Sequence, residues 1–479
     1  MSRFDVGLAG VPYSHRDRFK MKNEDTSRRV VVTGLGVVSA LGATLDDLWT
    51  ACREGRSGLK ATTKDYPLPV TTIAPADCFT GKIQDFGAEL DEPRRKAIRK
   101  GVKLMAREIQ TGVAAAQLAL QHAQLGHEYH PCRVGVSVAS DMMITAPQEV
   151  TDAFVACRDY VDGEPRFHFD QWRENGIKRM TPLWQLKYLT NMSASHVTIY
   201  NEFFGPAFDV TNREASFAIA VSEAIETIKR GAADAMIVGA TGSRLQPYRF
   251  VDALKSGEFT PEILRSEGAT APGVCRPFDA RRFGTVPGEG AGALLLESES
   301  TAVSRGAKIY AEAVGGASRS VICHARELNG GDCRLDATFE SLRESFRLTL
   351  RAIVRKLGLE AEEIGHINAA ARGDVLLDAA EAAGLRDVLG DALDAIPTTT
   401  LSGHIGNPGA GGGAIQTIAS ILALEHDALF PILNYGVADS DCRVNATREF
   451  GEKPGDSFLK LCANAAGQTS AVYFRRYKV

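Results

Sequence analysis

Two glycine-rich segments are similar in composition to the loops that bind phosphate groups in other proteins. The first, Gly34-x-Gly36-x-x-Ser39, ends an apolar, β-branched run, as the turn of a dinucleotide-binding unit does. Its third glycine is replaced by serine, and no acidic residue closes a second strand about 20 residues later. The second, from Ser402 to Ala414, lacks the Gly-Lys-Ser/Thr of a P-loop. Neither segment therefore predicts a nucleotide site, and both fit tight turns beside a closely packed helix.

The cysteines offer little metal or disulfide chemistry. There are nine, an odd number, and no two of them form a Cys-x-x-Cys pair, which argues against a structural zinc site. A disulfide framework is not expected in a chain of 479 residues either. We therefore expect a reduced, cytoplasmic setting with no metal and no cofactor. The nine are Cys52, Cys78, Cys132, Cys157, Cys275, Cys323, Cys333, Cys442 and Cys462.

Strands and helices are expected to alternate along the chain. Apolar runs of four to ten residues indicate buried strands, and apolar residues three and four apart indicate helices. This alternation favours α/β layers with parallel sheets covered on both faces. A buried strand and a tight turn are expected within 29–42. Further strands are expected at 133–139, 208–211, 235–240, 291–297, 308–315 and 364–369, and helices at 44–55, 214–230, 342–356, 375–384 and 411–426.

Composition narrows the functional classes. The chain is 44% hydrophobic and 24% charged, with a formal net charge of −4, so a nucleic-acid binder that depends on bulk positive charge is not expected. No apolar run approaches the roughly 18 residues that a membrane span needs. Residues 1–28 have no apolar signal region and are expected to form an extension ahead of the fold.

Several separated segments, taken in order, resemble the β-ketoacyl synthases of fatty-acid and polyketide assembly. The resemblance runs from about residue 29 to the C-terminus and implies a thiolase-like fold, in which two similar halves form a five-layer α/β/α/β/α core, usually as a dimer. It divides the chain into the extension 1–28, an N-terminal half 29–298 and a C-terminal half 299–479. The matching segments are Arg29–Gly42, Cys275–Asp279, Gly288–Gly292, Arg305–Glu312 and Ser402–His404.

The family's chemistry implies three catalytic positions. A cysteine at a helix N-terminus, with its pKa lowered by the helix dipole, carries the acyl chain as a thioester. Two histidines then assist decarboxylation of malonyl-carrier protein and stabilise the enolate that attacks the acyl group. No cofactor or metal is implied.

This sequence departs from that pattern at two of the three positions. The residue nine after Gly205 and 17 before Gly231, where the resemblance places the cysteine, is Glu214. The first histidine position is Ala370, whereas the second histidine is present as His404. The lysine normally five residues before that histidine is Thr399, and the C-terminal glycine-phenylalanine gate is replaced by 464–470.

A carboxylate at position 214 cannot replace a thiolate. It is a weaker nucleophile, and its acylation would give an anhydride that hydrolyses easily. A histidine without its partner should not sustain the reaction, because catalytic groups that act as a unit fail together. The chain therefore belongs by resemblance to an acyltransferase family but is not expected to condense acyl chains alone. Glu214 would instead be a capping or interface carboxylate, favoured by the helix N-terminus and paired with Arg213 or another cation.

Among the family members, chain-length factors of type II polyketide systems also lack the cysteine and pair with an active ketosynthase. The resemblance thus implies a noncatalytic subunit, as a heterodimer or homodimer, with acyl-carrier protein and an acyl chain as further partners. Two alternatives stay open: a homologue with residual decarboxylase or acyltransferase activity, and an acyl-binding scaffold. The basic run 92–100 fits a solvated helix face or a docking patch for an acidic carrier protein.

The remaining candidate residues are interpreted as structural. Glu289 matches a family glutamate that supports the histidine network, and here we expect packing and hydrogen bonding from it. Three cysteines are not expected to be substitute nucleophiles, because none lies at an expected strand-to-helix elbow. The residues expected to be structural are His196, Asp378 and Glu381, and the three cysteines are Cys275, Cys323 and Cys333.

Overall fold

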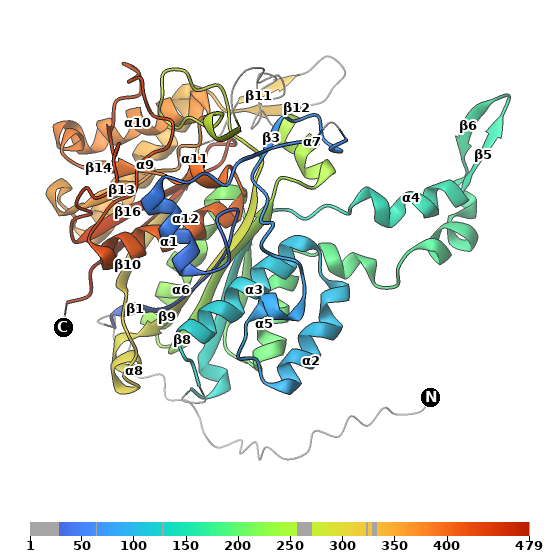
Figure 1. Ribbon diagram of the computed structural model, residues 1–479, viewed down its shortest axis with the longest axis horizontal. Helices are drawn as coiled ribbons and strands as arrows, with labels where there is room; N and C mark the ends of the chain where they lie inside the picture. Colours follow the sequence, from blue (N-terminus) through green and yellow to red (C-terminus); the bar gives the residue numbers. More distant parts are fainter. Residues whose placement is uncertain are drawn as a thin grey trace.

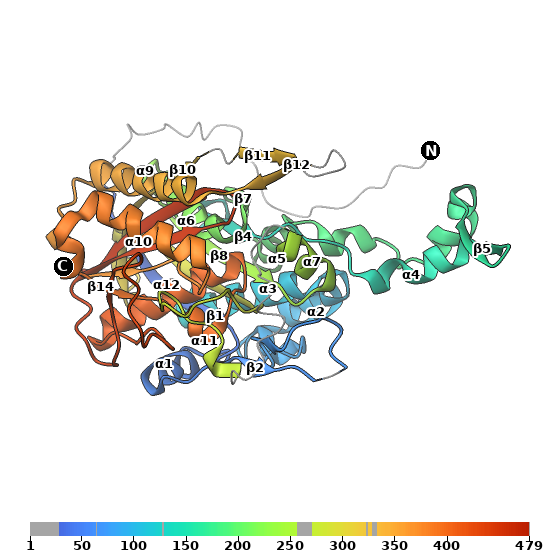
Figure 2. The ribbon, with the colours of Figure 1, turned by 90° about the horizontal axis from the view of Figure 1, so that it is seen from above.

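The computed structural model describes residues 28–63, 65–126, 129–255, 271–321, 324–327 and 333–478, the backbone alone for 324–327 and 333–336. The expected extension, apart from Arg28, lies outside the described residues, as does Cys323. Most of the chain forms one body, and a long arm projects from it (Figures 1 and 2).

Eleven strands form one mixed sheet in the order β15-β14-β13-β16-β17-β10-β1-β9-β8-β4-β7. The two halves join where β10 pairs with β1 over only two residues, Val31 opposite Glu312 and Val32 opposite Ala311. The strands are β1 (Val30–Val38), β4 (Val134–Ser140), β7 (Ala207–Thr211), β8 (Ala235–Ser243), β9 (Glu289–Ser298), β10 (Ala311–Ser320), β13 (His366–Asn368), β14 (Pro397–Thr399), β15 (Asn445–Ala446), β16 (Ser457–Ala463) and β17 (Gln468–Arg475).

The expectation of parallel sheets is wrong for the middle of this sheet. β4 runs parallel to β7 and β8, and β13 runs parallel to β14 and β16. By contrast, β1, β9, β10 and β17 pair with their neighbours in antiparallel fashion. Apolar runs reveal burial on both faces, but burial does not fix strand direction.

The helices form three layers around the two halves of this sheet, which confirms the five-layer α/β/α/β/α core (Figure 1). Helices α6 (Ser216–Lys229) and α12 (Ala410–His426) lie between the halves, since each contacts strands of both. One outer face is covered by α3 (Arg107–His122) and α5 (Met192–Asn201), and the other by α9 (Phe339–Leu357) and α10 (Val375–Leu389). The other helices are α1 (Leu45–Glu54), α2 (Glu92–Gly101), α7 (Pro247–Lys255), α8 (Glu299–Ser304) and α11 (Ser402–Ile405).

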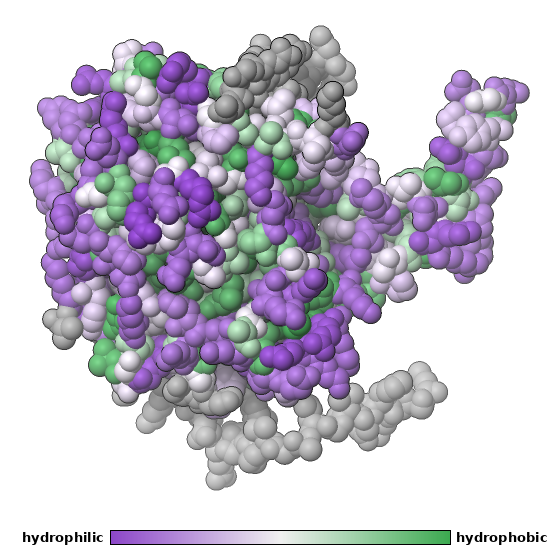
Figure 3. All heavy atoms as spheres, in the orientation of Figure 1, coloured by the Kyte–Doolittle hydropathy of each residue, from purple (hydrophilic) through white to green (hydrophobic). Residues whose placement is uncertain are grey.

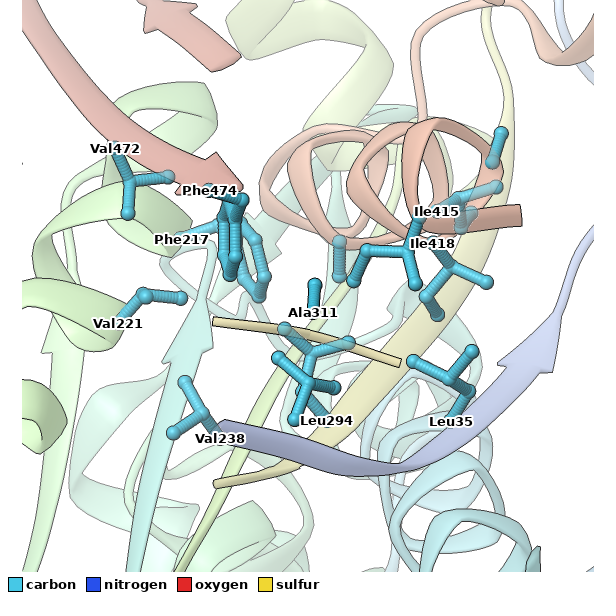
Figure 4. Close-up of a cluster of buried hydrophobic side chains, with 14 of the residues drawn as sticks. Leu35, Phe217, Val221, Val238, Leu294, Ala311, Ile415, Ile418, Val472 and Phe474 are labelled. Carbon is cyan, nitrogen blue, oxygen red and sulfur yellow. The ribbon is translucent and has the colours of Figure 1, made fainter. Parts of the chain in front are cut away.

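The main core fills the space around the two central helices. Phe217 and Val221 of α6 pack against Phe474 of β17, and Ile415 and Ile418 of α12 lie over β1 and β9 (Figure 4). All five side chains are fully buried. The helix expected at 411–426 is therefore buried all round, which explains why it is apolar on every face.

Glycines let the central helix approach the sheet closely, as expected for the second glycine-rich segment. A Cβ atom at Gly411 would lie 2.0 Å from the carbonyl oxygen of Gly290 in β9. One at Gly292 would lie 2.8 Å from Cβ of Ala414. Larger residues at these positions would force α12 away from β9.

The projecting arm spans 142–191 and consists of α4 (Pro147–Ala156), the hairpin β5 (Arg158–Val161) and β6 (Glu164–Phe167), and several short helical turns. Asp162 and Gly163 form the hairpin turn with φ of 53° and 84°. Two positive φ values are what a two-residue hairpin turn requires. Rings of Phe154, Phe167 and Trp172 lie 5.3–6.2 Å apart and hold the hairpin against α4.

Two further small sheets complete the described structure. β2 (Lys60–Ala61) pairs with β3 (Thr72–Ile73), and β11 (His324–Glu327) pairs with β12 (Cys333–Asp336). In the described ranges no helix is long and apolar enough to cross a bilayer.

Candidate functional site

Glu214 lies at a strand-to-helix elbow. β7 ends at Thr211, a 3-10 turn spans Arg213–Ala215, and α6 begins at Ser216. Arg213 has a φ of +51°, in the left-handed region that non-glycine residues rarely adopt. The Ser216 hydroxyl fixes this bend, since it donates to Arg213 O and accepts from Asn212 N, both at 2.7 Å. The sharp turn points the Glu214 side chain into the interior, with only 8% of the residue exposed.

The Glu214 carboxylate is held by three side chains. Its Oε1 accepts hydrogen bonds from Arg244 Nη2 at 2.7 Å and Asn407 Nδ2 at 3.0 Å. Arg372 Nη1 lies 3.7 Å from the same oxygen. Burial alone would raise the pKa of Glu214, but Arg244, Arg372 and Asn407 outweigh it and hold this pKa below its usual range. These contacts thus favour the ionised form of Glu214.

The cation beside Glu214 is not the one next to it in sequence. Arg213 Nη2 instead bonds Asp252 of α7 at 3.1 Å. Arg244 immediately follows β8, and Arg372 follows β13 in the other half of the chain. No local pattern indicates these two arginines or Asn407, because only the meeting of the strand ends brings them to position 214.

Ala370 has a methyl group at the first histidine position and so has no group that could transfer a proton. Its backbone N–H donates to Glu381 Oε1 at 2.7 Å. Burial raises the pKa of Glu381 to about 8. Glu381 therefore supports the loop after β13, in line with the structural role expected for it.

A buried lysine that sequence analysis did not single out lies beside this loop. Lys460 of β16 donates to Asn368 Oδ1 at 2.8 Å, Gln416 Oε1 at 2.9 Å and Ala369 O at 3.0 Å. Burial lowers the pKa of Lys460 to about 8. Its three donors are thus all used to join β13 to α12.

Glu214, Ala370, Arg372 and Lys460 line a common cavity of about 30 Å³. His404 is not among its lining residues. The cavity has room for about one or two water molecules, whereas pockets for drug-sized ligands measure about 300–1,000 Å³. The structure thus brings Glu214 and Ala370 to one cavity, which is smaller than a pocket for an acyl chain.

His404 lies in α11 and is fully buried, with its ring centroid 6.4 Å from that of Phe430 and the two rings nearly perpendicular. Neither ring nitrogen has a hydrogen-bond partner in the described part of the chain. Burial lowers the pKa of His404 to about 3. The imidazole of His404 is therefore expected to be neutral at pH 7.

His404 should make the protein acid-sensitive, and replacing it by Leu should reduce that sensitivity. Below about pH 6.5 the unfolded chain binds a proton at this histidine and the folded chain does not, so stability falls as the pH falls towards 3. Urea unfolding at pH 7 and pH 5 should show that His404→Leu removes about 2 kcal/mol of the wild-type pH-dependent loss. An equal loss in both proteins would mean that the imidazole is charged or hydrogen-bonded.

Thr399 and Glu289 have structural contacts. Thr399 Oγ1 donates to Phe430 O at 2.7 Å. Glu289 forms a two-point ion pair with Arg107 of α3, with N–O distances of 2.8 and 3.2 Å, and accepts from Ala76 N at 3.1 Å. Glu289 therefore joins β9 to the outer helical layer.

The other candidate residues also make contacts within the fold. Asp378 accepts three backbone N–H groups, and His196 stacks on Tyr200 with ring centroids 5.3 Å apart. Cys275 is buried, its Sγ donates to Arg372 O at 3.3 Å, and burial raises the pKa of its thiol. Cys333 lies in β12, of which only the backbone is described. No three potential metal ligands come together among the residues that the structure covers.

Family models place this chain among known proteins. The model "Beta-ketoacyl synthase, N-terminal domain" matches residues 27–302, and "Beta-ketoacyl synthase, C-terminal domain" matches 320–436. The chain is 27% identical over 422 residues to 3-oxoacyl-[acyl-carrier-protein] synthase 2 of Synechocystis sp., covering 87% of this chain and 90% of that protein.

Two solved structures share the fold. One is the complex of a type II PKS acyl-carrier protein with its ketosynthase bound to the hexaketide. The matched chain of that complex has a TM-score of 0.75 and is 23% identical to this chain. The other is the ishigamide ketosynthase/chain length factor, with a TM-score of 0.73 and 22% identity. Each match covers 94% of this chain and all of the other chain.

The thiolase-like fold and these matches define the class of protein: the chain belongs to the β-ketoacyl synthase family. Within it, this is a ketosynthase-like protein of fatty-acid or polyketide biosynthesis.

Proposed function

We propose that this chain is a noncatalytic, chain-length-factor-like subunit that pairs with an active ketosynthase. The observation that carries the proposal is the Glu214 carboxylate, bonded to Arg244 and Asn407 at the elbow where the family has its nucleophile. Since the arginines keep it ionised, it has no proton to donate, and its acylation would give an anhydride that hydrolyses easily where the family keeps a persistent thioester.

Two further features support a loss of turnover. Ala370 removes one imidazole of the pair that stabilises the enolate, which also argues against a decarboxylase. The cavity of about 30 Å³ beside Glu214 is too small to hold an acyl chain, which argues against an acyl-binding scaffold that uses this site.

The exposed edge of the sheet supports pairing with a second synthase subunit. β7 is the last strand in the sheet order and pairs only with β4 among the described strands. An unpaired edge readily accepts another strand. Apolar side chains are exposed on the arm (Figure 3) and at Phe204, just before β7. They include Tyr160, Phe169, Ile177, Leu183 and Phe204, each more than half exposed.

The decisive experiment assays condensation with purified protein. The chain alone should give no 3-oxoacyl product from acyl- and malonyl-carrier protein and release no carbon dioxide. Together with a ketosynthase that keeps its cysteine and both histidines, it should form a 1:1 complex that makes product. Product from the chain alone would refute the proposal, and carbon dioxide without product would favour the decarboxylase.

A cationic surface supports the acyl-carrier protein as a further partner. Lys96, Arg99, Lys100 and Lys103, on and just after α2, are all exposed and spaced along one helical face. None of them pairs with a carboxylate in the described part of the protein. Such a surface would steer an acidic carrier protein towards the complex.

Charge reversal on this surface should weaken carrier-protein binding. The Lys96→Glu, Lys100→Glu double variant is expected to lower the association rate of carrier protein with the complex by about ten-fold at low salt, and less at high salt. Stopped-flow binding at two salt concentrations measures this. The matched control reverses Arg351 and Arg355 on exposed positions of α9, on the other side of the core, and should leave the rate unchanged.

A further inference from the structure

Three charged side chains meet at the ends of three neighbouring parallel strands. Asp141 follows β4, Glu214 follows β7 and Arg244 follows β8, and the sheet order is β8-β4-β7. Because the carboxyl ends of parallel strands lie at one edge of a sheet, these side chains are brought together there. Arg244 Nη1 bonds Asp141 Oδ2 at 2.6 Å, and Arg244 Nη2 bonds Glu214 Oε1 at 2.7 Å. The exposed fractions of the three side chains are 4%, 10% and 0% for Asp141, Glu214 and Arg244.

The glycine-rich segment of the C-terminal half is shaped around this charged triad. Gly409 has a φ of +66°, and a Cβ atom there would lie 2.0 Å from Asp141 Oδ2 and 2.8 Å from Arg244 Nη1. A Cβ atom at Gly242 would lie 2.6 Å from Asp141 Oδ2. Asn407 bonds Glu214 through Nδ2 and accepts from Gly409 N at 2.9 Å. The turn that packs α12 on the sheet thus also encloses the triad.

The charges of this cluster explain why position 214 is an acid and not an amide. Arg244 and Arg372 both face Glu214, and Asp141 is the second carboxylate on Arg244. Arg249 Nη2 also lies 4.0 Å from Asp141 Oδ1, so two carboxylates face three guanidinium groups. Glutamine at 214 would keep the shape but remove one negative charge from a buried cluster, which is costly in a site of low polarity.

Asp141 also immediately precedes the arm, and residues 141–146 form the arm root. It is the first residue after β4, and the chain then runs out to α4 and returns to the body at α5. Arg244 can hold Asp141 in one orientation only if the plane of the Arg244 guanidinium group is itself fixed. Glu214 fixes that plane, because its carboxylate accepts a hydrogen bond from Arg244 Nη2. The former nucleophile position is thereby linked to the segment that carries the exposed apolar side chains.

We propose that Glu214 is a positioning residue for partner binding: through Arg244 it orients Asp141 and hence the root of the arm. The occupant of the arm surface is a ketosynthase subunit with an intact cysteine, which rests on the proposed function. The arm root follows β4, which pairs directly with the edge strand β7. A second copy of this chain would supply no nucleophile, so a homodimer would leave both sites inert.

The experiment compares Glu214→Gln with Glu297→Gln. Glu297 is also a buried carboxylate, and it pairs with Arg305 at 2.8 Å. It lies near the C-terminal end of β9, far from the arm. Amide hydrogen exchange of the free chain is measured for 141–146, together with the dissociation constant for a ketosynthase subunit. Glu214→Gln should speed exchange at the arm root and weaken binding by about ten-fold each, equivalent to about 1.4 kcal/mol. Glu297→Gln should change neither beyond its effect on the whole protein.

The outcomes separate this inference from the proposed function. Unchanged exchange at 141–146 in folded Glu214→Gln, or exchange raised equally throughout the chain, would overturn the positioning role. Faster exchange confined to the arm root with unchanged affinity would uphold that role and refute the arm as the partner surface. Wild-type protein that binds no ketosynthase would refute the proposed function while the exchange result still decides the role of Glu214.

Discussion

Arg244→Met is expected to destabilise the folded chain by about 3–5 kcal/mol, the usual cost of removing one partner from a buried ion pair. Methionine fills a similar volume but leaves Asp141 and Glu214 buried without their shared guanidinium, to which they are bonded at 2.6 and 2.7 Å. Glu214 keeps Asn407, but Asp141 loses its short ion pair. The midpoint of urea unfolding at pH 7 measures the loss.

The matched control for this variant is Arg351→Met. Arg351 is exposed on α9, so its replacement should change stability by about 0.5 kcal/mol or less. Adding Asp141→Asn to Arg244→Met should recover part of the loss, because it removes one of the unpaired charges. Similar stabilities for Arg244→Met and Arg351→Met would show that the triad contributes nothing.

Asp378→Ala is expected to cost about 3 kcal/mol or more. Asp378 is fully buried in α10 and accepts from the backbone N–H groups of Arg372 at 2.9 Å and of Gly373 and Phe278 at 3.0 Å. Each buried donor left without a partner costs about 1–3 kcal/mol. Because one carboxylate holds two loops, the loss should be large, and urea unfolding measures it.

Asp378→Asn provides a graded comparison. Both carboxylate oxygens of Asp378 accept hydrogen bonds, so an amide in their place loses at least one acceptor. Its stability should therefore fall between wild type and Asp378→Ala. An alanine variant as stable as wild type would mean that water replaces the carboxylate at no cost.

Helices with clear local signals were predictable from the sequence. The helix expected at 44–55 forms as Leu45–Glu54, where the Thr44 hydroxyl accepts from Asp47 N and Gly55 ends the helix with a φ of +63°. Strand direction was not predictable, because a buried strand such as β1 or β9 has the same apolar sequence pattern whether its neighbours run parallel or antiparallel to it. The arm hairpin was overlooked although Asp162-Gly163 is a strong hairpin signal.

The candidate site was predictable only in part. The resemblance indicated positions 214, 370 and 404, and the structure brings Glu214 and Ala370 to one cavity that His404 does not line. Arg244, Arg372, Asn407 and Lys460 come from four other segments, and their roles depend on how strand ends meet in space. Contacts between residues that lie far apart in the chain leave no periodic or local pattern in a single sequence.

The small cavity beside Glu214 bears on what a single substitution at this position could achieve. The Glu214 carboxylate faces two buried guanidinium groups, and the cavity beside it measures about 30 Å³. A cysteine at position 214 would have no imidazole at Ala370 and would leave those guanidinium groups without their carboxylate. Glu214→Cys alone is therefore not expected to give a condensing enzyme.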